Sequence, residues 1–238
     1  MYLKILAGPE ALAKAAAELF VAKTIEAVAK QGFFTVALSG GSTPKLLYQL
    51  LADRAEVPWS SIHFFWTDER HVPPDDPENN YSMAYDALLS RVPVSKVHRV
   101  LSENPSAADA AQDYEKTVLE FVPETPPRFD LILLGVGTDG HTASIFPGAE
   151  VLNERKRLVA ASYVEKLKRY RITMTLPLIN NAASVMFLVS GTEKAEIVKE
   201  VLHGPKKYPA QEVRPIKGEL VWLLDREAAS KLQRDFQD

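Results

Sequence analysis

Short apolar runs alternate with longer segments of helical periodicity along most of this chain. The Ala-rich segment 9–31 has apolar residues at helical spacing, with Pro9 at its start and Gly32 just past its end, which predicts a helix. The run FFTVALS at 33–39 predicts a strand. The same patterns predict further strands at 62–67, 129–136, 158–163, 172–176, 185–190 and 220–224, and further helices at 44–52, 82–90, 107–121, 192–202 and 226–236.

The order of these elements predicts the fold class. Alternating strands and helices are typical of an α/β protein with a mostly parallel sheet and helices on both faces. The nearly all-apolar run FDLILLGV at 129–136 fits a strand that is buried on both sides. The Pro-rich stretches 72–77 and 123–127 are expected to be surface loops. Since neither separates halves of different composition, we expect one domain over residues 1–238.

Three polar motifs each follow a predicted strand directly. They are SGGSTP at 39–44, TDER at 67–70 and GVGTDGH at 135–141. In a parallel sheet the loops after the strands lie at the same edge, and ligands bind where the strand order reverses. We therefore expect these three loops to meet at one crevice.

The first motif has the features of a phosphate cradle. Gly40 and Gly41 allow the backbone to approach a ligand closely, and Ser42 and Thr43 add hydroxyl donors at the predicted start of a helix, where N–H groups are free to bind an anion. The alternative is a tight turn with Ser42 as the N-cap. The spacing of a Walker A loop is absent.

The second and third motifs offer charged and titratable side chains. A lone charge run such as Asp68-Glu69-Arg70 is usually a solvated turn, but its place after a buried strand favours a role for Arg70 in gripping an anion or stabilising an oxyanion. The third motif formally matches G-x-G-x-x-G, but no full helix follows it, so dinucleotide binding is rejected. What remains is His141, a candidate general base, with Asp139 two residues before it.

Composition narrows the classes of function. The 238 residues are 46% hydrophobic with a net charge of -3, so neither nucleic acid nor a membrane is a predicted partner. The absence of Cys excludes a thiolate nucleophile and Cys-bound zinc. It fits a cytoplasmic location, and a secreted protein without cysteine is the alternative. No two histidines have metal-ligand spacing, so no metal site is predicted.

Together the motifs resemble those of the 6-phosphogluconolactonase family. The shared segments are GGSTP, TDER-x-VP, G-x-G-x-DGHTAS-x-FPG and R-I-T-x-TLP-x-IN, and the resemblance runs from the first predicted strand to the last helix. It implies a Rossmann-like fold, hydrolysis of the lactone 6-phosphogluconolactone without a cofactor, and a functional link to glucose-6-phosphate dehydrogenase. It places the catalytic base on His141, an acidic partner on Asp68, and the substrate-binding cations on Arg70, Lys166 and Arg171.

One segment departs from the family pattern. Family members have prolines before the R-I-T strand, whereas this chain reads EKLKRYR at 165–171. Lys166 keeps the family spacing to Arg171, but Lys168 and Arg169 are rival cations. The sequence leaves the choice among these three open.

Two other functions remain as alternatives. Glucosamine-6-phosphate deaminases share the fold, but they carry a glutamate for proton transfer where this chain has Phe146, which cannot transfer a proton. Sugar-phosphate sensor domains of transcription regulators also share it, but no DNA-binding helices or basic patch are predicted here.

Overall fold

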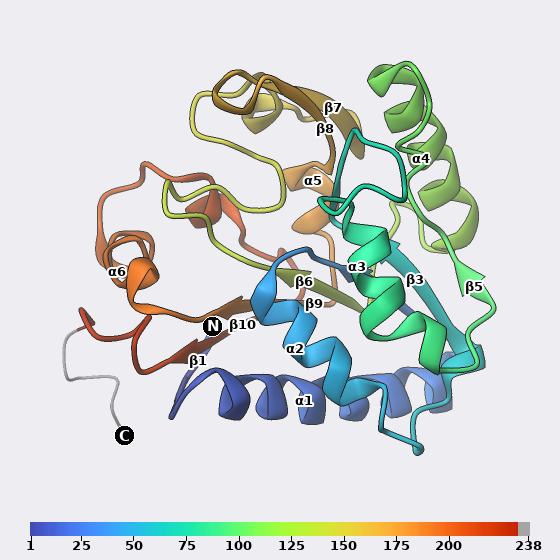
Figure 1. The fold of residues 1–238 in the computed structure, drawn as a ribbon, viewed down its shortest axis with the longest axis horizontal. Helices are drawn as coiled ribbons and strands as arrows, with labels where there is room; N and C mark the ends of the chain where they lie inside the picture. The colour runs from blue at the N-terminus through green and yellow to red at the C-terminus, as the bar shows by residue number, and fades with distance from the viewer. Residues whose placement is uncertain (233–238) are drawn as a thin grey trace.

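The computed structural model describes residues 1–232 and is built around a seven-stranded parallel sheet (Figure 1). The strand order is β1-β10-β9-β6-β2-β3-β5, and every neighbouring pair is parallel. This confirms the α/β class with a mostly parallel sheet. The strands are β1 (Tyr2–Leu6), β2 (Phe34–Leu38), β3 (Ile62–Trp66), β5 (Lys96–Val97), β6 (Leu131–Leu134), β9 (Ser184–Val189) and β10 (Glu219–Asp225).

The strand order reverses between β2 and β6. From β2 the chain continues to β3 and β5 on one side, and it then returns to β6 on the other side of β2. The loops after β2 and β6 therefore lead away from each other at the carboxyl edge of the sheet. This divergence leaves room for a ligand between them.

Side chains from successive strand positions enter two separate cores, one on each face of the sheet. In β2, for example, Val36 and Leu38 pack into one cluster and Ala37 into the other, as the two-residue period of a strand requires. Helices α1 (Pro9–Gln31), α2 (Ser42–Leu51) and α3 (Asn80–Ala87) cover the first face. The other face is covered by α4 (Ala107–Phe121), α5 (Leu176–Ile179), α6 (Ala195–His203) and a second sheet.

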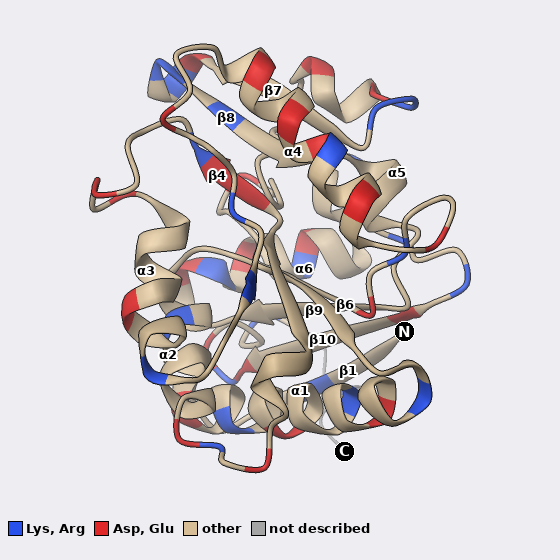
Figure 2. Cartoon of the chain, turned by 90° about the vertical axis from the view of Figure 1, so that its right-hand side faces the viewer, with Lys and Arg blue, Asp and Glu red and all other residues tan. Residues whose placement is uncertain are grey.

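The second sheet corrects two expectations from the sequence. It is antiparallel and has the order β4-β8-β7, and it lies apart from the main sheet, at the top of Figure 2. The TDER motif is therefore not a loop, because residues 68–70 form β4 (Asp68–Arg70). The predicted strands 158–163 and 172–176 are β7 (Val159–Val164) and β8 (Arg169–Met174), and they do not join the parallel sheet.

Most predicted helices match the structure, and the exception is the closing helix. The helices 9–31 and 107–121 have the predicted bounds. Strand β1 was not predicted, and the closing helix at 226–236 was wrong for its described part, since residues 226–231 form turns. The carboxylate of Asp225 accepts a hydrogen bond from the Ala228 N–H there. Residues 233–236 lie outside the described part of the chain.

Two half-buried histidines at the β3–β5 edge link stability to pH. The rings of His63 and His98 stack with centroids 5.2 Å apart, and Nδ1 of His63 lies 3.0 Å from Nε2 of His98. Burial, reinforced by the charge of His63, lowers the pKa of His98 to about 4. Burial also lowers the pKa of His63.

We expect the protein to lose stability as the pH falls from 6.5, the ordinary histidine pKa, to about 4. In this window the unfolded chain binds more protons than the folded one, whereas above it the two states bind equally. Because both rings are only half buried, screening limits the effect to roughly 1 kcal/mol. The variant His98→Phe keeps an aromatic ring beside Phe65 and Phe121. Its melting temperature should fall less than that of the wild type on acidification, and an equal fall would contradict the assignment.

Candidate active site

The three polar motifs converge on one cavity of about 400 Å³ at the carboxyl ends of β2 and β6. This is the position that the reversal of strand order predicts. Ser42 and Thr43 of the first motif are not part of the lining, because α2 begins at Ser42, with Gly41 as its N-cap at φ 107°. The predicted site residues that line the cavity are Gly40, Gly41, Asp68, Arg70, His141, Lys166 and Arg171.

His141 is oriented by a carboxylate from its own turn. Nδ1 of His141 lies 2.5 Å from Oδ1 of Asp139. Although partial burial acts to raise the pKa of Asp139, hydrogen bonds from Lys166 and His141 lower it to about 2. The carboxylate is therefore ionised at neutral pH and can only accept a hydrogen bond, so Nδ1 must carry the proton. Nε2 of neutral His141 is then left as a proton acceptor.

The turn that carries His141 depends on glycine. A Cβ atom at residue 137 would lie 2.0 Å from Nδ1 of His141, so any other residue would displace the imidazole. The N–H of Gly137 donates to the carbonyl of His141 at 2.9 Å, and the N–H of Gly140 donates to the carbonyl of Gly137 at 2.8 Å. Because these two amides are used within the turn, they are not free to stabilise an oxyanion.

Phe146 supports both His141 and Lys166. Its ring stacks on His141 with centroids 4.2 Å apart, and the Lys166 ammonium lies 4.8 Å from the ring centroid. Lys166 also forms an ion pair with Asp139. Of the three rival cations, only Lys166 lines the cavity; Arg169 pairs with Glu78 instead.

Arg70, which is half-buried, and Arg171, which is buried, form a pair of like charges. They are direct partners across β4 and β8, an arrangement that is destabilising on its own because opposite residues share one face. Arg171 is 8% exposed, and within residues 1–232 its Nε and Nη1 have no hydrogen-bond partner. Burial, reinforced by the charge of Arg70, lowers the pKa of Arg171. A buried guanidinium that lines a cavity and has donors without partners favours an anion site there.

A buried network below these arginines contains residues that the sequence analysis missed. Glu69 is 1% exposed and accepts hydrogen bonds of 2.8 Å from the N–H groups of Arg70, Asn80 and Tyr81. Burial raises the pKa of Glu69 to about 7. The Asn80 side chain donates to the carbonyl of Asp68 at 2.9 Å. This network fixes β4 against the start of α3.

Two further lining residues were also missed. Ser144 donates a hydrogen bond of 2.5 Å to the carboxylate of Asp68, and half-buried Lys194 ends the short 3-10 helix η5 (Thr192–Lys194) after β9. Ser144 was hidden inside the His141 motif. Gly191, directly after the predicted strand 185–190, was a usable signal for Lys194, because it marks a fourth loop at the same edge of the sheet.

The family of "Glucosamine-6-phosphate isomerases/6-phosphogluconolactonase" matches this chain over residues 7–222. The chain belongs to this family. It is 41% identical over 237 residues to a 6-phosphogluconolactonase of Nostoc sp., which covers 96% of this chain and 97% of the relative. The solved structure of 6-phosphogluconolactonase from Trypanosoma brucei is similar with a TM-score of 0.86 and 31% identity, covering 98% of each chain.

A third relative places a similar sequence within a longer protein. The "GDH/6PGL endoplasmic bifunctional protein" of Oryctolagus cuniculus is 39% identical over 235 residues, which cover 94% of this chain and 29% of the relative. The family membership confirms the resemblance that the motifs indicated, and the solved structure confirms the Rossmann-like α/β class.

We expect the activity of the purified protein to survive treatment with EDTA. Within residues 1–232 no group of three or more His, Asp or Glu side chains is placed to hold a metal ion, and His141 already has an ionised partner that orients it. The test compares the turnover rate of the protein before and after EDTA treatment, and the two rates should be equal. Loss of activity that a divalent ion restores would reveal a metal site.

No helix within residues 1–232 has the length and apolar character to cross a membrane.

Proposed function

We propose that this protein hydrolyses 6-phospho-D-glucono-1,5-lactone to 6-phosphogluconate, with His141 as the general base. One observation carries the proposal: an imidazole oriented by a carboxylate and a buried arginine, whose Nε and Nη1 have no hydrogen-bond partner within residues 1–232, line the same cavity of about 400 Å³. The first can activate water, and the second can hold an anionic group of the substrate. A phosphorylated lactone needs both residues, because its ester is opened by activated water and its phosphate is held by a cation. The relatives named above as 6-phosphogluconolactonases support this substrate class.

The chemistry needs one base and no cofactor. Nε2 of His141 removes a proton from water as the water oxygen attacks C1 of the lactone, which gives a tetrahedral oxyanion. When this intermediate collapses, the bond between C1 and the ring oxygen breaks, and protonated His141 returns its proton to that oxygen. Asp139 holds Nδ1–H throughout and stabilises the imidazolium that forms. The product is the open-chain acid.

We assign the phosphate of the substrate to Arg70 and Arg171. Their side chains share one face of the β4–β8 pair, so one dianion can neutralise both charges. Gly40 and Gly41 add a closely approachable backbone to the lining of the same cavity. Lys166 lines the same cavity and is paired with Asp139, and we assign it a contact with the phosphate as well. Asp68 fixes the side chain of Ser144, whose hydroxyl donates to its carboxylate, and both residues line the cavity.

The reaction implies a place in metabolism. Oxidation of glucose 6-phosphate at C1 produces this lactone, so we propose a functional link to glucose-6-phosphate dehydrogenase. A relative whose name describes a bifunctional protein supports this link. We also propose a cytoplasmic location, which the absence of cysteine favours.

The deciding experiment mixes the pure protein with freshly made 6-phosphogluconolactone and follows ring opening. A rate well above spontaneous hydrolysis, proportional to protein concentration, is expected. Glucosamine 6-phosphate serves as the control substrate, because a deaminase would release ammonia from it. Ammonia release without lactone hydrolysis would replace this proposal with the deaminase function.

A further inference from the structure

The residue directly before His141 rests on a segment from a distant part of the chain. A Cβ atom at Gly140 would lie 2.4 Å from Cδ1 of Tyr208, so the Tyr208 ring is in close contact with the Gly140 backbone. The N–H of Ala210 also donates a hydrogen bond of 3.1 Å to the carbonyl of Gly140. Residues 208–210 line no part of the cavity. They support the turn of His141 from outside it.

One buried amide organises this supporting segment. Gln211 is 9% exposed. Its Oε1 accepts hydrogen bonds from the N–H groups of Lys207 at 2.6 Å and Tyr208 at 2.8 Å. Its Nε2 donates to three carbonyl groups, those of Glu200 at 3.2 Å, Gly204 at 3.4 Å and Pro205 at 3.2 Å. A single side chain therefore fixes the path of residues 204–208 and, with it, the position of Tyr208.

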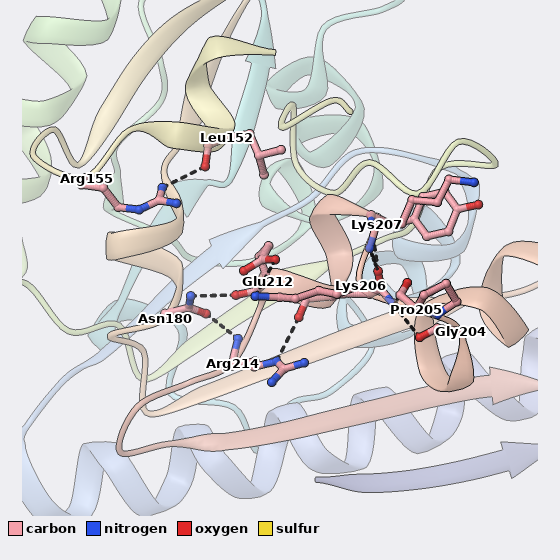
Figure 3. A network of polar contacts seen from close by, with 11 residues as sticks. Leu152, Arg155, Asn180, Gly204, Pro205, Lys206, Lys207, Glu212 and Arg214 are labelled. Atoms are coloured by element: carbon pink, nitrogen blue, oxygen red, sulfur yellow. Dashed lines mark hydrogen bonds and ion pairs between the residues drawn. The ribbon is translucent and has the colours of Figure 1, made fainter. Parts of the chain in front are cut away.

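A second amide anchors the same segment through contacts that include no residue of the His141 turn. Nδ2 of Asn180 donates to the carbonyl of Glu212 at 2.9 Å, and Oδ1 of Asn180 accepts from the N–H of Arg214 at 2.6 Å. Figure 3 shows these contacts around Asn180, with Gly204, Pro205 and Lys207 on the other side of the segment. Gln211 and Asn180 thus stabilise one segment, but only Gln211 holds the part that reaches Gly140.

We propose that Gln211 is a positioning residue for His141. It acts by holding Tyr208 against Gly140, and this inference rests on the proposed role of His141 as the general base. A base must lie within hydrogen-bond reach of the water that it activates, and a displacement of about 1 Å at a reacting group can cost ~10²-fold in rate. Arg70 and Arg171, to which we assign the phosphate, lie in the second sheet (β4-β8-β7), whereas the turn of His141 follows β6 of the main sheet. Loss of Gln211 should therefore impair the chemical step and leave binding intact.

The test compares Gln211→Met with the matched variant Asn180→Ala. Met fills a similar volume but makes none of the amide hydrogen bonds, so kcat should fall by roughly 10- to 100-fold. KM and the dissociation constant of 6-phosphogluconate should stay within about a factor of two of the wild type. Asn180→Ala removes the two side-chain hydrogen bonds of Asn180 to the same segment. It should lower the melting temperature but keep the wild-type kcat.

Normal kcat in folded Gln211→Met would overturn the inference, and so would an equal loss in Asn180→Ala, since a general loosening of the segment would then explain both. If Gln211→Met does not fold, Tyr208→Ala is judged by the same criteria, because it removes the ring that contacts Gly140. The wild type is measured first. If the wild type is active and the variant keeps the wild-type kcat, only the role of Gln211 is contradicted. If the wild type is inactive, both the proposed function and the role of Gln211 are overturned.

Discussion

Replacing His141 by asparagine is expected to lower kcat by ~10²- to 10⁴-fold while the protein stays folded, which is the range for loss of a general base. The amide has a similar polarity but cannot accept a proton from water. The substrate phosphate should still bind, because Arg70 and Arg171 are unchanged, so KM should change little. The measurement is turnover of fresh lactone, corrected for spontaneous hydrolysis, together with circular dichroism of the variant.

Two further variants sharpen this prediction. Asp139→Asn should also lower kcat, because an amide no longer requires the proton of His141 to sit on Nδ1. His71→Asn is the control, since His71 lies outside the cavity and contacts the carbonyl of Asn104 at 2.6 Å. Near-normal kcat in a folded His141→Asn would remove His141 from the mechanism.

The second large effect is expected at the phosphate site. The variant Arg171→Met should lose about 10²-fold or more in kcat/KM, because two charge-assisted hydrogen bonds contribute ~1.5–3 kcal/mol each. Its stability should be unchanged or higher, since Met removes a buried cation whose neighbour is Arg70 and whose Nε and Nη1 have no partner among the described residues. Inorganic phosphate should raise the melting temperature of the wild type and have a smaller effect on the variant.

Unphosphorylated gluconolactone provides the matching substrate control. It should react with a kcat/KM several powers of ten lower in the wild type, and Arg171→Met should change that low rate little. Lys166→Ala should impair the phosphorylated substrate more than the unphosphorylated one, whereas Lys168→Ala should do little because Lys168 lies outside the cavity. Equal kcat/KM values for the two lactones would disprove the phosphate site. A larger loss in Lys168→Ala than in Lys166→Ala would assign the substrate-binding cation to Lys168 instead.

Local physical rules were sufficient to predict much of the framework. Helix α1 begins at Pro9 and ends at Gln31 before a left-handed Gly32, and both signals are readable without tertiary contacts. The buried strands β2 and β6 are apolar because both of their sides face a core. His141 stood out because a strand, a glycine turn and an acidic neighbour come together within a few residues.

Other features depended on contacts between distant parts of the chain. The sequence by itself determined the parallel sheet and the meeting of the loops after β2 and β6, and it singled out His141 as the candidate for the general base. Only the tertiary structure decided that Asp68–Arg70 is a strand, since its partner β8 lies about a hundred residues away and pairing across that distance leaves no local pattern. For the same reason, only the tertiary structure placed Arg171 beside Arg70 and selected Lys166 from its neighbours. A periodic pattern of apolar residues predicts which side of an element is buried. It does not predict which charged residue from a distant part of the chain lies on that side.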